Sequence, residues 1–462
     1  MRNLNCNPVM KACAVLLLWA ATAVVLSAQT FNTLHSFDGT DGANSYAGLL
    51  QGADGNLYGT TFAGGSEDLG SIFRITPGRA FTSVHSFAAA NGSNPFGSLI
   101  QGSDGSLYGT ASEDGANGVG TFFKIALNGT LTTLHSFDNT DGATPYAGLV
   151  QGLDGNFYGT TQSGGAGGYG TVFEITSGGT LTTLHSFNGR DGDSPSAALV
   201  LASNGKFYGT TQSGGAHNLG TVFQIAPGGR LITLHSFGGT DGSHPSAGLV
   251  QGADGGLYGT AGDGGANNVG AVFEIASTGA FSTLYSFCSL SGCADGQHPI
   301  GTLVQAADGN FYGTTTRGGA NGDGSVFEFS LNGGLTVLHS FMGPDGEQPY
   351  AGLFQDTNGT FYGATNLGGA NNAGTVFSLS VGLGPFVTTL PGFGKVGAKV
   401  GILGTDLTGA TTITFNGTAA TFKVVSSSLI ETKVPSGATT GTVQVSTSGG
   451  MLASNVPFRV LN

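Results

Sequence analysis

The chain has 462 residues, of which 85 are glycine and only 41 are charged, 14 Lys or Arg and 27 Asp or Glu. Charged residues make up 9% of the chain, against about 25% in ordinary globular proteins. So much glycine argues against a helical protein, because each Gly inside a helix costs about 1 kcal/mol relative to Ala. A hydrophobic content of 39%, with 31 Phe, argues against disorder. We therefore expect an all-β fold with many turns.

The first 28 residues have the pattern of a secretory signal peptide. Arg2 and Lys11 accompany an apolar run from Ala12 to Leu26, and Ser27-Ala28 offers small residues for cleavage. The alternative, a membrane anchor, requires about 20 apolar residues, which is more than this run contains. We expect residues 1–28 to be removed and the mature protein to be secreted or held at the cell surface, with the periplasm as the alternative compartment.

Cleavage would change both the charge and the cysteine content. Residues 1–28 hold two basic and no acidic residues, so the net charge goes from −13 to −15. Such an acidic chain is a poor partner for nucleic acid, whose phosphates are bound by Lys and Arg. Two cysteines remain, Cys288 and Cys293, and outside the cytoplasm we expect them to form a disulfide rather than stay as thiols.

One unit of about 50 residues recurs seven times along the chain. The string Tyr-Gly-Thr, with Ala for Thr in the last copy, begins at Tyr58, Tyr108, Tyr158, Tyr208, Tyr258, Tyr312 and Tyr362. A second string, His-Ser-Phe, begins at His35, His85, His135, His185, His235 and His339, with Tyr285 in the sixth place. A third string, of the form Val-Phe-Glu-Ile, surrounds Phe73, Phe123, Phe173, Phe223, Phe273, Phe327 and Phe377.

Each unit predicts four short antiparallel strands. In the third copy an apolar run at 148–152 is followed by an Asp-Gly-Asn turn and a strand at 157–161. A long Gly-rich loop, a strand at 171–175, a tight Ser-Gly-Gly turn and a strand at 181–187 complete the unit. Four strands in about 40–50 residues are typical of a β-propeller blade.

The two ends of the repeat region complement each other. A lone fourth-type strand at 31–37 precedes the first unit, and the last unit stops after its third-type strand at 375–379. We expect the N-terminal strand to complete the last blade and close a seven-bladed β-propeller over residues 29–380, which would protect the exposed sheet edges. An open solenoid would instead need capping units at both ends.

The connections of such blades alternate between two faces, so the short turns share one face and the long loops share the other. Loops on a rigid scaffold often carry binding residues, and we therefore predict a partner-binding site on the long-loop face. Its non-repeated polar residues are Glu67, Asp68, Glu113, Asp114, Arg190, Asp193, His217, His244, Asp263, His298, Arg317, Asp323 and Glu347. No Ser-His-Asp set, zinc spacing or phosphate loop joins them, so we assign no catalytic, cofactor-binding or metal-ligating residue. Their simplest interpretation is a set of solvated loop charges.

Three repeated polar residues have both a structural and a functional interpretation. A shared metal site is disfavoured for the repeated His, because blade symmetry keeps the copies apart, and we expect them to pack between blades. The Gln at positions 51, 101, 151, 251, 305 and 355 either line a polar channel or, as we prefer, bond between blades. The Asp-Gly pairs that begin at 41, 141, 191, 241, 295 and 345 are ordinary turn chemistry. We expect no cofactor, with weak calcium loops as the alternative, although the spacing is not that of an EF-hand.

The 50-residue period ends after 381–385. Residues 385–462 alternate as seven short strands, which fits a small Ig-like β-sandwich. The predicted strands are 386–389, 399–403, 412–415, 420–425, 429–434, 442–445 and 456–460. Because the linker is short, we expect this unit to lie close to the repeats.

Two resemblances to known families follow from these strings. The unit Ala-Gly-Leu-Val-Gln-Gly-x-Asp-Gly-Asn-Phe-Tyr-Gly-Thr-Thr resembles the GloVer tandem-repeat family over residues 31–380. That resemblance implies an exported, surface-associated protein, although this chain shows no terminal hydrophobic anchor. Residues 385–462 resemble an IPT/TIG domain through Gly401-Ile-Leu-Gly-Thr-Asp and Val434-Pro-Ser-Gly-Ala, which implies an Ig-like spacer or adhesion module. Neither resemblance supplies catalytic residues.

Our leading hypothesis is a non-enzymatic, monomeric binding or surface-scaffold protein whose partner is an extracellular protein or glycan. The main alternative is a secreted polysaccharide hydrolase or lyase that uses a loop carboxylate such as Glu67, Glu113 or Asp263. A third interpretation, surface-layer material without a ligand, predicts self-assembly at high concentration.

Overall fold

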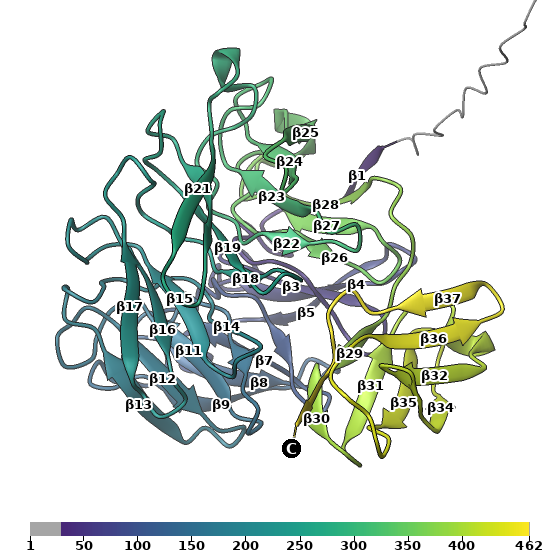
Figure 1. The fold of residues 1–462 in the computed structure, drawn as a ribbon. Coiled ribbons are helices and arrows are strands. Elements are labelled where there is room, and N and C mark those ends of the chain that lie inside the picture. Colours follow the sequence, from purple (N-terminus) through teal and green to yellow (C-terminus); the bar gives the residue numbers. More distant parts are fainter. Residues whose placement is uncertain (1–28, 462) are drawn as a thin grey trace, which may run out of the picture.

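The computed structural model describes residues 29–461, so the predicted signal peptide lies outside the described residues. Within them the chain forms seven four-stranded antiparallel sheets, followed by a C-terminal unit of two further four-stranded sheets and a strand pair. Figure 1 shows short strands such as β18 and β22 toward the middle of the repeat region and long strands such as β17 and β21 at its periphery. None of the helical segments in residues 29–461 could reach across a lipid bilayer.

The first six sheets each use four consecutive strands. The first has β2 (Leu50–Gln51), β3 (Leu57–Thr61), β4 (Ser71–Ile75) and β5 (Phe81–Ser86), and the second has β6 (Ile100–Gln101), β7 (Leu107–Ala111), β8 (Thr121–Ile125) and β9 (Leu131–Ser136). The third has β10 (Val150–Gln151), β11 (Phe157–Thr161), β12 (Thr171–Ile175) and β13 (Leu181–Ser186), and the fourth has β14 (Val200–Leu201), β15 (Phe207–Thr211), β16 (Thr221–Ile225) and β17 (Leu231–Ser236). The fifth has β18 (Val250–Gln251), β19 (Leu257–Ala261), β20 (Ala271–Ile275) and β21 (Phe281–Ser286), and the sixth has β22 (Val304–Gln305), β23 (Phe311–Thr315), β24 (Ser325–Phe329) and β25 (Leu335–Ser340). The innermost strands are shorter than the predicted apolar run, with two residues each.

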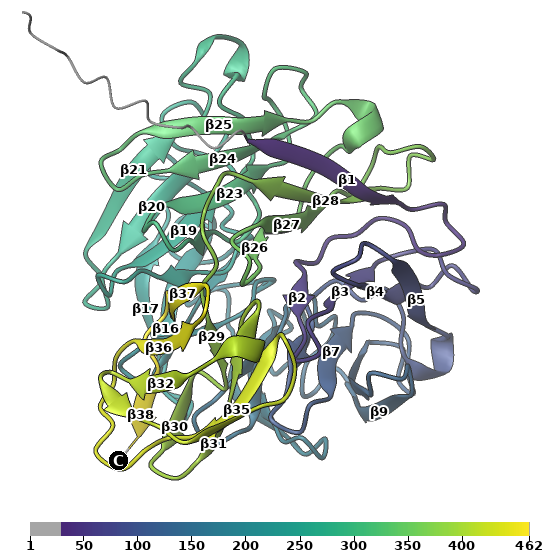
Figure 2. The ribbon, with the colours of Figure 1, turned by 90° about the vertical axis from the view of Figure 1, so that its right-hand side faces the viewer.

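The seventh sheet takes one strand from the other end of the repeat region. β26 (Phe354–Gln355), β27 (Phe361–Ala364) and β28 (Thr375–Ser380) pair with β1 (Thr30–Ser36) in the order β1-β28-β27-β26. β1 pairs with β28 from Thr30 opposite Ser380 to Ser36 opposite Thr375. The predicted pairing of the N-terminal strand with the last unit is therefore present, and Figure 2 shows β1 lying along β28.

Packing between the sheets explains why Gly follows Tyr in every repeat. A β-carbon on Gly159 would lie 2.6 Å from the Phe173 ring and 2.9 Å from Leu149. Both neighbours are buried in the core between the second and third sheets. The Tyr-Gly-Thr string thus marks the position where a large Phe of the next strand needs the space of a missing side chain.

Small residues from all seven sheets contact one another in sequence. A β-carbon on Gly48 would lie 3.2 Å from the Ser98 hydroxyl and 3.5 Å from the Gly352 carbonyl. The same kind of contact links the positions that follow in chain order, which are Ser98, Gly148, Ala198, Gly248, Thr302 and Gly352. The series of contacts returns to the sheet in which it started.

The repeated His and Asp form pairs rather than separate sites. His35 Nε2 lies 2.7 Å from Asp41 Oδ2, and four other sheets repeat this contact at 2.7–3.0 Å. Tyr285 replaces His in the sixth place, and its hydroxyl donates to Asp295 at 2.7 Å. The Asp of each Asp-Gly pair thus anchors the loop to the preceding His or, in the sixth place, to Tyr285. As expected, repeated His also pack between sheets, since His35 stacks on Phe81 and His235 on Phe281.

Four of the six repeated Gln bond between sheets, as expected, among them Gln51, which donates to the Thr357 hydroxyl at 3.2 Å. Gln151 bonds to Gly155 O within its own sheet, and the Gln355 side chain has no hydrogen-bond partner in residues 29–461. Gln101 accepts from the Ala53 N–H at 2.8 Å, Gln251 from Ser203 at 2.7 Å and Gln305 from Ala253 at 2.8 Å. In each case a Gln side chain holds the first turn of the preceding sheet.

The C-terminal unit has ten strands, where seven were predicted. Its sheets are β29 (Thr388–Leu390), β31 (Lys399–Leu403), β35 (Leu429–Lys433) and β34 (Phe422–Val424); β33 (Thr418–Ala419), β32 (Thr412–Phe415), β36 (Val443–Thr447) and β37 (Gly450–Ala453); and the parallel pair β30 (Phe393–Lys395) with β38 (Arg459–Leu461). The missed strands are β30, β33 and β37, which are short or contain Gly and so lack an alternating pattern. The two larger sheets share one core, in which Ile402, Ile413, Ile430 and Val445 are buried.

This unit lies across the short turns of the repeat region, which we call the turn face (residues 52–56, 76–80 and their equivalents). Phe386 N–H donates to Thr357 O at 2.9 Å, and Arg459 Nη1 donates to Ala202 O at 3.3 Å. Ser428 lies against Gly55. These contacts involve turns of the first, fourth and seventh sheets, and Figure 2 shows the unit in yellow against the repeats. The short linker does place it close to them.

Candidate binding site

The long loops gather on the side opposite the C-terminal unit, which we call the loop face (residues 37–49, 62–70 and their equivalents). In each unit the loop between sheets pairs with the loop between the second and third strands, for example Ala43 with Ala63 and Ser243 with Asp263. Three 3-10 turns lie in these loops, η1 (Ala89–Asn91), η2 (Ser291–Cys293) and η3 (Gly343–Asp345); η4 (Leu407–Gly409) belongs to the C-terminal unit. The predicted grouping of the long loops is thus present.

One residue of each loop between sheets adopts a left-handed backbone with φ of 51–57°. These residues are Asn44, Asn94, Thr144, Ser194, His244, His298 and Gln348. Each N–H donates to a loop carbonyl of the preceding sheet, as Asn44 does to Ala373 and His298 to Val269. The strained residues fasten successive sheets together and fix the direction of the side chains that follow.

The residues two positions after these left-handed residues form an inner rim, which is aromatic on one side and has mostly small side chains on the other. The rim residues are Tyr46, Phe96, Tyr146, Ser196, Ser246, Ile300 and Tyr350. On one side Tyr46 stacks on Phe96 with centroids 4.7 Å apart, Tyr350 meets Tyr46 at 5.0 Å, and Tyr146 meets Phe96 at 4.7 Å. We call these four the aromatic arc. Burial raises the pKa of Tyr46 and of Tyr146, with nearby Glu113 adding to the shift for Tyr146.

On the other side the rim residues are small, and a hollow of about 380 Å³ opens there. It is lined by Gln212, His244, Ser246, Gly262, Asp263, His298 and Ile300. These residues come from the loops of the fourth, fifth and sixth sheets. The hollow exists because Ser246 stands where the opposite side carries a Tyr or Phe.

The hollow contains the only three predicted binding residues that the described structure brings together. Asp263 accepts from two imidazoles, with Oδ1 2.9 Å from His298 Nδ1 and Oδ2 3.2 Å from His244 Nδ1. His298 Nδ1 also lies 3.1 Å from Gly262 O, so this ring is fixed by two acceptors. The Asp263 side chain remains 44% exposed and His244 38% exposed, so both reach solvent from a fixed position.

The other predicted residues lie apart on different loops. Glu67, Glu113, Arg190, His217 and Arg317 are exposed. Asp68 Oδ1 accepts from Gly64 N–H at 2.8 Å, Asp193 from the Ser194 hydroxyl at 2.9 Å, and Asp323 from Gly343 N–H at 3.3 Å. The backbone of Asp114 bridges to Val119 and that of Glu347 to Leu367. Within residues 29–461 no group of three His, Cys, Asp or Glu is arranged to hold a metal ion.

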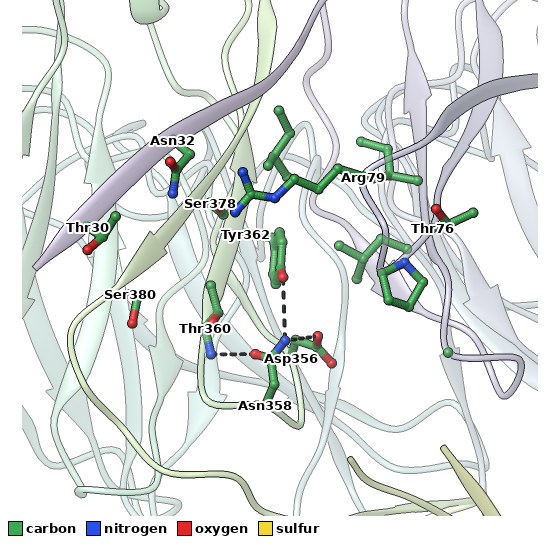
Figure 3. Close-up of a pocket in the computed structure, with 15 residues that line it drawn as sticks. Thr30, Asn32, Thr76, Arg79, Asp356, Asn358, Thr360, Tyr362, Ser378 and Ser380 are labelled. Carbon is green, nitrogen blue, oxygen red and sulfur yellow. Dashed lines mark hydrogen bonds between the residues drawn. The ribbon is translucent and has the colours of Figure 1, made fainter. Parts of the chain in front are cut away.

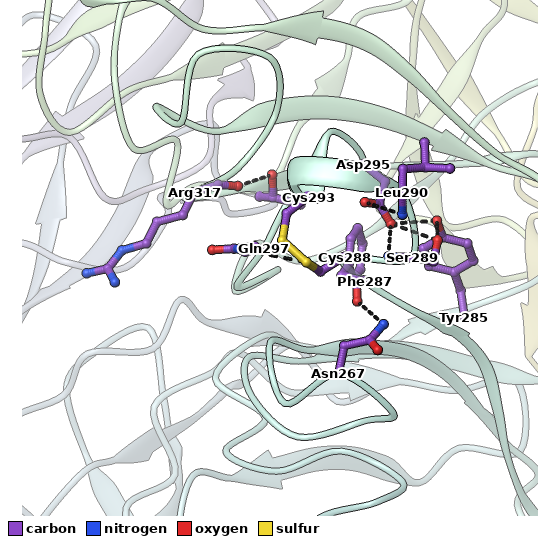
Figure 4. Close-up of a disulfide and its surroundings, with 11 residues drawn as sticks. Asn267, Tyr285, Phe287, Cys288, Ser289, Leu290, Cys293, Asp295, Gln297 and Arg317 are labelled. Carbon is purple, nitrogen blue, oxygen red and sulfur yellow. Dashed lines mark hydrogen bonds between the residues drawn. A yellow bond between two sulfur atoms is a disulfide. The ribbon is translucent and has the colours of Figure 1, made fainter.

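Cys288 and Cys293 are joined by a disulfide in the inserted loop of the sixth unit (Figure 4). The loop is further fixed by Asp295, a fully buried carboxylate that accepts from Tyr285, Ser289 and Leu290. These hydrogen bonds hold the pKa of Asp295 below its ordinary value despite its burial. The insertion lengthens this loop relative to those of the other units but keeps the pair Asp295-Gly296, and His298 follows two residues later.

The family comparison covers most of the chain. The sequence profile of the Gloeobacter/Verrucomicrobia repeat matches residues 21–153, 128–294 and 288–424. The chain belongs to this repeat family. The resemblance inferred from the Tyr-Gly-Thr and His-Ser-Phe strings is therefore confirmed, and the third match runs on into the C-terminal unit. No curated protein matches the repeat protein at a significant level.

Solved structures resemble the repeat protein in fold at low sequence identity. Two are extracellular domains of two-component-system proteins from B. thetaiotaomicron, with TM-scores of 0.52 and identities of 11% and 12%. The matches cover 93% and 94% of this chain but 57% and 59% of those chains. A fungal alcohol oxidase of the AA5 family, solved with copper, also has a TM-score of 0.52, at 12% identity, over 94% of this chain and 99% of its own. These matches include extracellular domains of two-component-system proteins and an enzyme, so they support the fold and not an activity.

Proposed function

We propose that the chain is an exported, non-enzymatic binding protein that presents the loop face to an extracellular protein or glycan. Its seven sheets would be the blades of a seven-bladed β-propeller, and its C-terminal unit an Ig-like β-sandwich that spaces or docks the propeller. The pairing of β1 with β28 and the circular series of contacts through Gly48 and Gly352 support the propeller. The shared core of two four-stranded sheets supports the sandwich.

The observation that supports the binding role is that the two faces of the repeat region differ: one contacts the C-terminal unit, and the other presents polar and aromatic side chains. The C-terminal unit occupies part of the turn face, where it contacts Thr357, Ala202 and Gly55. The loop face carries the aromatic arc on one side of its rim and the Asp263 hollow on the other. An aromatic surface beside fixed polar groups suits a sugar chain, because a pyranose ring has an apolar face and polar edges. The extracellular nature of two matched structures supports the location.

The test is a binding screen of residues 29–462 against glycans, cell-wall material and envelope proteins, with and without calcium. We expect a ligand whose binding is weakened by Tyr46→Ala and by Asp263→Asn but not by Glu67→Gln. Glu67 is a suitable control because it is exposed on the same face and lies away from the rim. A uniformly negative screen, or binding that Glu67→Gln weakens as much as Asp263→Asn, would refute the proposal.

A second candidate, a polysaccharide hydrolase or lyase, is favoured by one observation. Asp263 is a carboxylate held by two His in a hollow, the kind of arrangement that can transfer protons. In that case Asp263→Asn would abolish release of new chain ends from a polysaccharide, and Glu67→Gln and Glu113→Gln would not. If cleavage persists in Asp263→Asn, this candidate is excluded.

A further inference from the structure

A second pocket, of about 300 Å³, lies on the turn face at the seam between the seventh and first sheets (Figure 3). We call it the seam pocket. Its polar lining includes Arg79, Asp356, Asn358, Tyr362 and Ser378. Its apolar lining includes Leu34, Leu57, Ile75 and Pro77.

The way β1 joins the seventh sheet explains why space is available here. In the first six sheets a tight turn, such as Thr76–Ala80, joins the third strand to the fourth. In the seventh sheet β28 ends at Ser380 and its partner β1 begins at Thr30, so no turn connects them. Among residues 29–461 no tight turn closes these two strand ends, and the seam pocket lies between them and the first sheet.

The side chain that fills the equivalent space in the other sheets is shortened here. The position of Ser378 is occupied elsewhere by Arg74, Lys124, Glu174, Gln224, Glu274 and Glu328. Gln224 accepts from the Tyr208 hydroxyl at 2.9 Å, and Glu328 accepts from Asn310 at 2.6 Å. No hydrogen bond joins the short Ser378 side chain to the corresponding Tyr362, and both residues line the seam pocket.

Asp356 is the second departure from the repeat. The other six sheets have Gly or Ala at this position, and a β-carbon on Gly102 would lie 2.7 Å from the ring of Tyr108. Asp356 is nine-tenths buried, and it accepts from Thr357 N–H and Asn358 Nδ2, each at 2.7 Å. Burial raises its pKa to about 6. The Thr357 hydroxyl adds a longer contact to Oδ1 at 3.4 Å. Two carboxylate oxygens offer about four acceptor sites, so Asp356 retains capacity for one further donor from a ligand.

Arg79 is the third departure, and it approaches from the first sheet. Its φ is 66°, a conformation in which the other complete sheets have Gly129, Gly179, Gly229, Gly279 and Gly333. Figure 3 shows its guanidinium above Tyr362, with Asp356 below that ring. Within residues 29–461, Arg79 and Asp356 do not form an ion pair with each other. A cation and an anion thus face one pocket without neutralising each other.

We propose that the seam pocket binds a single neutral sugar of pyranose size. Its volume lies at the small end of the range for ligand pockets, about 300–1,000 Å³. A sugar hydroxyl can donate to Asp356 and accept from Arg79, whereas an anionic ligand would be repelled by the first and a cationic ligand by the second. The exposed Pro77 side chain offers an apolar surface for the C–H face of the ring, with the buried Leu57 and Ile75 behind it.

The test is calorimetric titration of residues 29–462 with D-glucose, D-galactose, D-mannose and N-acetylglucosamine. We expect at least one to bind, and Asp356→Gly and Ser378→Glu each to weaken it by about tenfold or more, as the loss of a charge-assisted hydrogen bond or of space predicts. Both variants restore residues found in the other sheets, so they are expected to fold, which circular dichroism and thermal melting would check. Ala306→Gly, the same position as Asp356 in the sixth sheet, is the matched control.

The site is distinguished from the loop face by Asp263→Asn, which should leave this binding unchanged. A crystal soaked in the binding sugar should show it beside Asp356 and Arg79. The proposal is overturned if none of the four sugars binds, or if binding survives Ser378→Glu at full strength. Loss of binding in Asp263→Asn but not in Asp356→Gly would assign the sugar to the loop face instead, which also overturns it.

Discussion

The ring of Phe31 stacks on the imidazole of His339, with centroids 3.7 Å apart and an angle of 6° between their planes. The same contact joins His35 to Phe81, at 3.7 Å and 6°, and His235 to Phe281, at 3.9 Å and 7°. Each pair connects the fourth strands of neighbouring sheets. β1 therefore packs against the sixth sheet as β5 packs against β1, although 308 residues separate Phe31 from His339.

This equivalence predicts the cost of removing Phe31. Phe31 also lies 5.3 Å from Phe377 and 5.8 Å from Phe341, so Phe31→Ala removes contacts to two sheets. We expect it to lower the free energy of unfolding by about 2–4 kcal/mol, somewhat less than a fully buried Phe, as measured by urea unfolding. Phe81→Ala, its counterpart in the first sheet, should cost a similar amount. A negligible effect of Phe31→Ala beside a large effect of Phe81→Ala would mean that β1 is not part of the folded seventh sheet.

A second prediction concerns the Gly of the Tyr-Gly-Thr string. Gly159→Ala places a methyl group 2.6 Å from the Phe173 ring in a packed core, and overpacking of this kind costs about 1–3 kcal/mol. Gly178→Ala is the control, because its β-carbon would meet only Thr176 at 3.8 Å. Thermal unfolding should show a clear loss for Gly159→Ala and little change for Gly178→Ala. Equal melting temperatures would contradict the packing explanation of the repeat.

Much of the repeat architecture could be predicted because the same sequence unit recurs seven times. A single Asp-Gly pair is only a turn signal, but the strings fix strand order, the long-loop side and the pairing of β1 with β28. The His–Asp pairs were also within reach of the sequence, because Asp41 follows His35 by six residues and four other units repeat the spacing. The C-terminal unit occurs once, and its strands with Gly, such as β30 and β37, were missed.

The candidate sites were harder to predict, because they depend on departures from the repeat. Asp263, His244 and His298 were each recognised as non-repeated, but they lie on separate loops, and the sequence does not show that two His share one carboxylate. Ser246 contributes through its small size, because the hollow requires a small side chain at the position that Tyr46 occupies in the first unit. In the same way, the seam pocket depends on the shortness of Ser378 and on a missing turn, neither of which is a motif.

A third prediction separates binding from stability at Asp263. Its side chain is 44% exposed, and ion pairs of such exposure contribute about 0–1 kcal/mol. Asp263→Asn should therefore leave the melting temperature nearly unchanged while weakening any ligand of the hollow. Differential scanning calorimetry beside the binding measurement would show this. A large loss of stability would mean that Asp263 serves to hold the loops together and not to bind.

A fourth prediction is the pH dependence of stability that Asp356 causes. Burial raises its pKa to about 6 in the folded protein, against about 3.9 in an unfolded chain. Between these values the folded state binds more protons than the unfolded state, so this group makes stability fall as pH rises from about 4 to about 6. Above that range the cost is about 2–3 kcal/mol.

The measurement is urea unfolding of the wild-type protein and Asp356→Asn at pH 4.5 and pH 7. The variant should be more stable than the wild type at pH 7 and closer to it at pH 4.5. Arg79 and Tyr362, the charged and titratable groups that flank Asp356 in the seam pocket, are present in both proteins and cancel in the comparison. A constant difference between the two proteins at both pH values would show that Asp356 does not titrate in this range.

The fifth prediction is that Arg79 is held at a cost to stability. It adopts φ of 66°, and a β-carbon at the equivalent Gly129 would lie 2.6 Å from the Val84 carbonyl. A non-Gly residue in this conformation costs of order 1 kcal/mol, so Arg79→Gly should raise the free energy of unfolding by up to about 1 kcal/mol in urea. Gly129→Ala, which introduces the same strain in the second sheet, should lower it. If Arg79→Gly instead destabilises the protein, Arg79 makes a stabilising contact in the seam pocket, and its presence there needs no ligand to explain it.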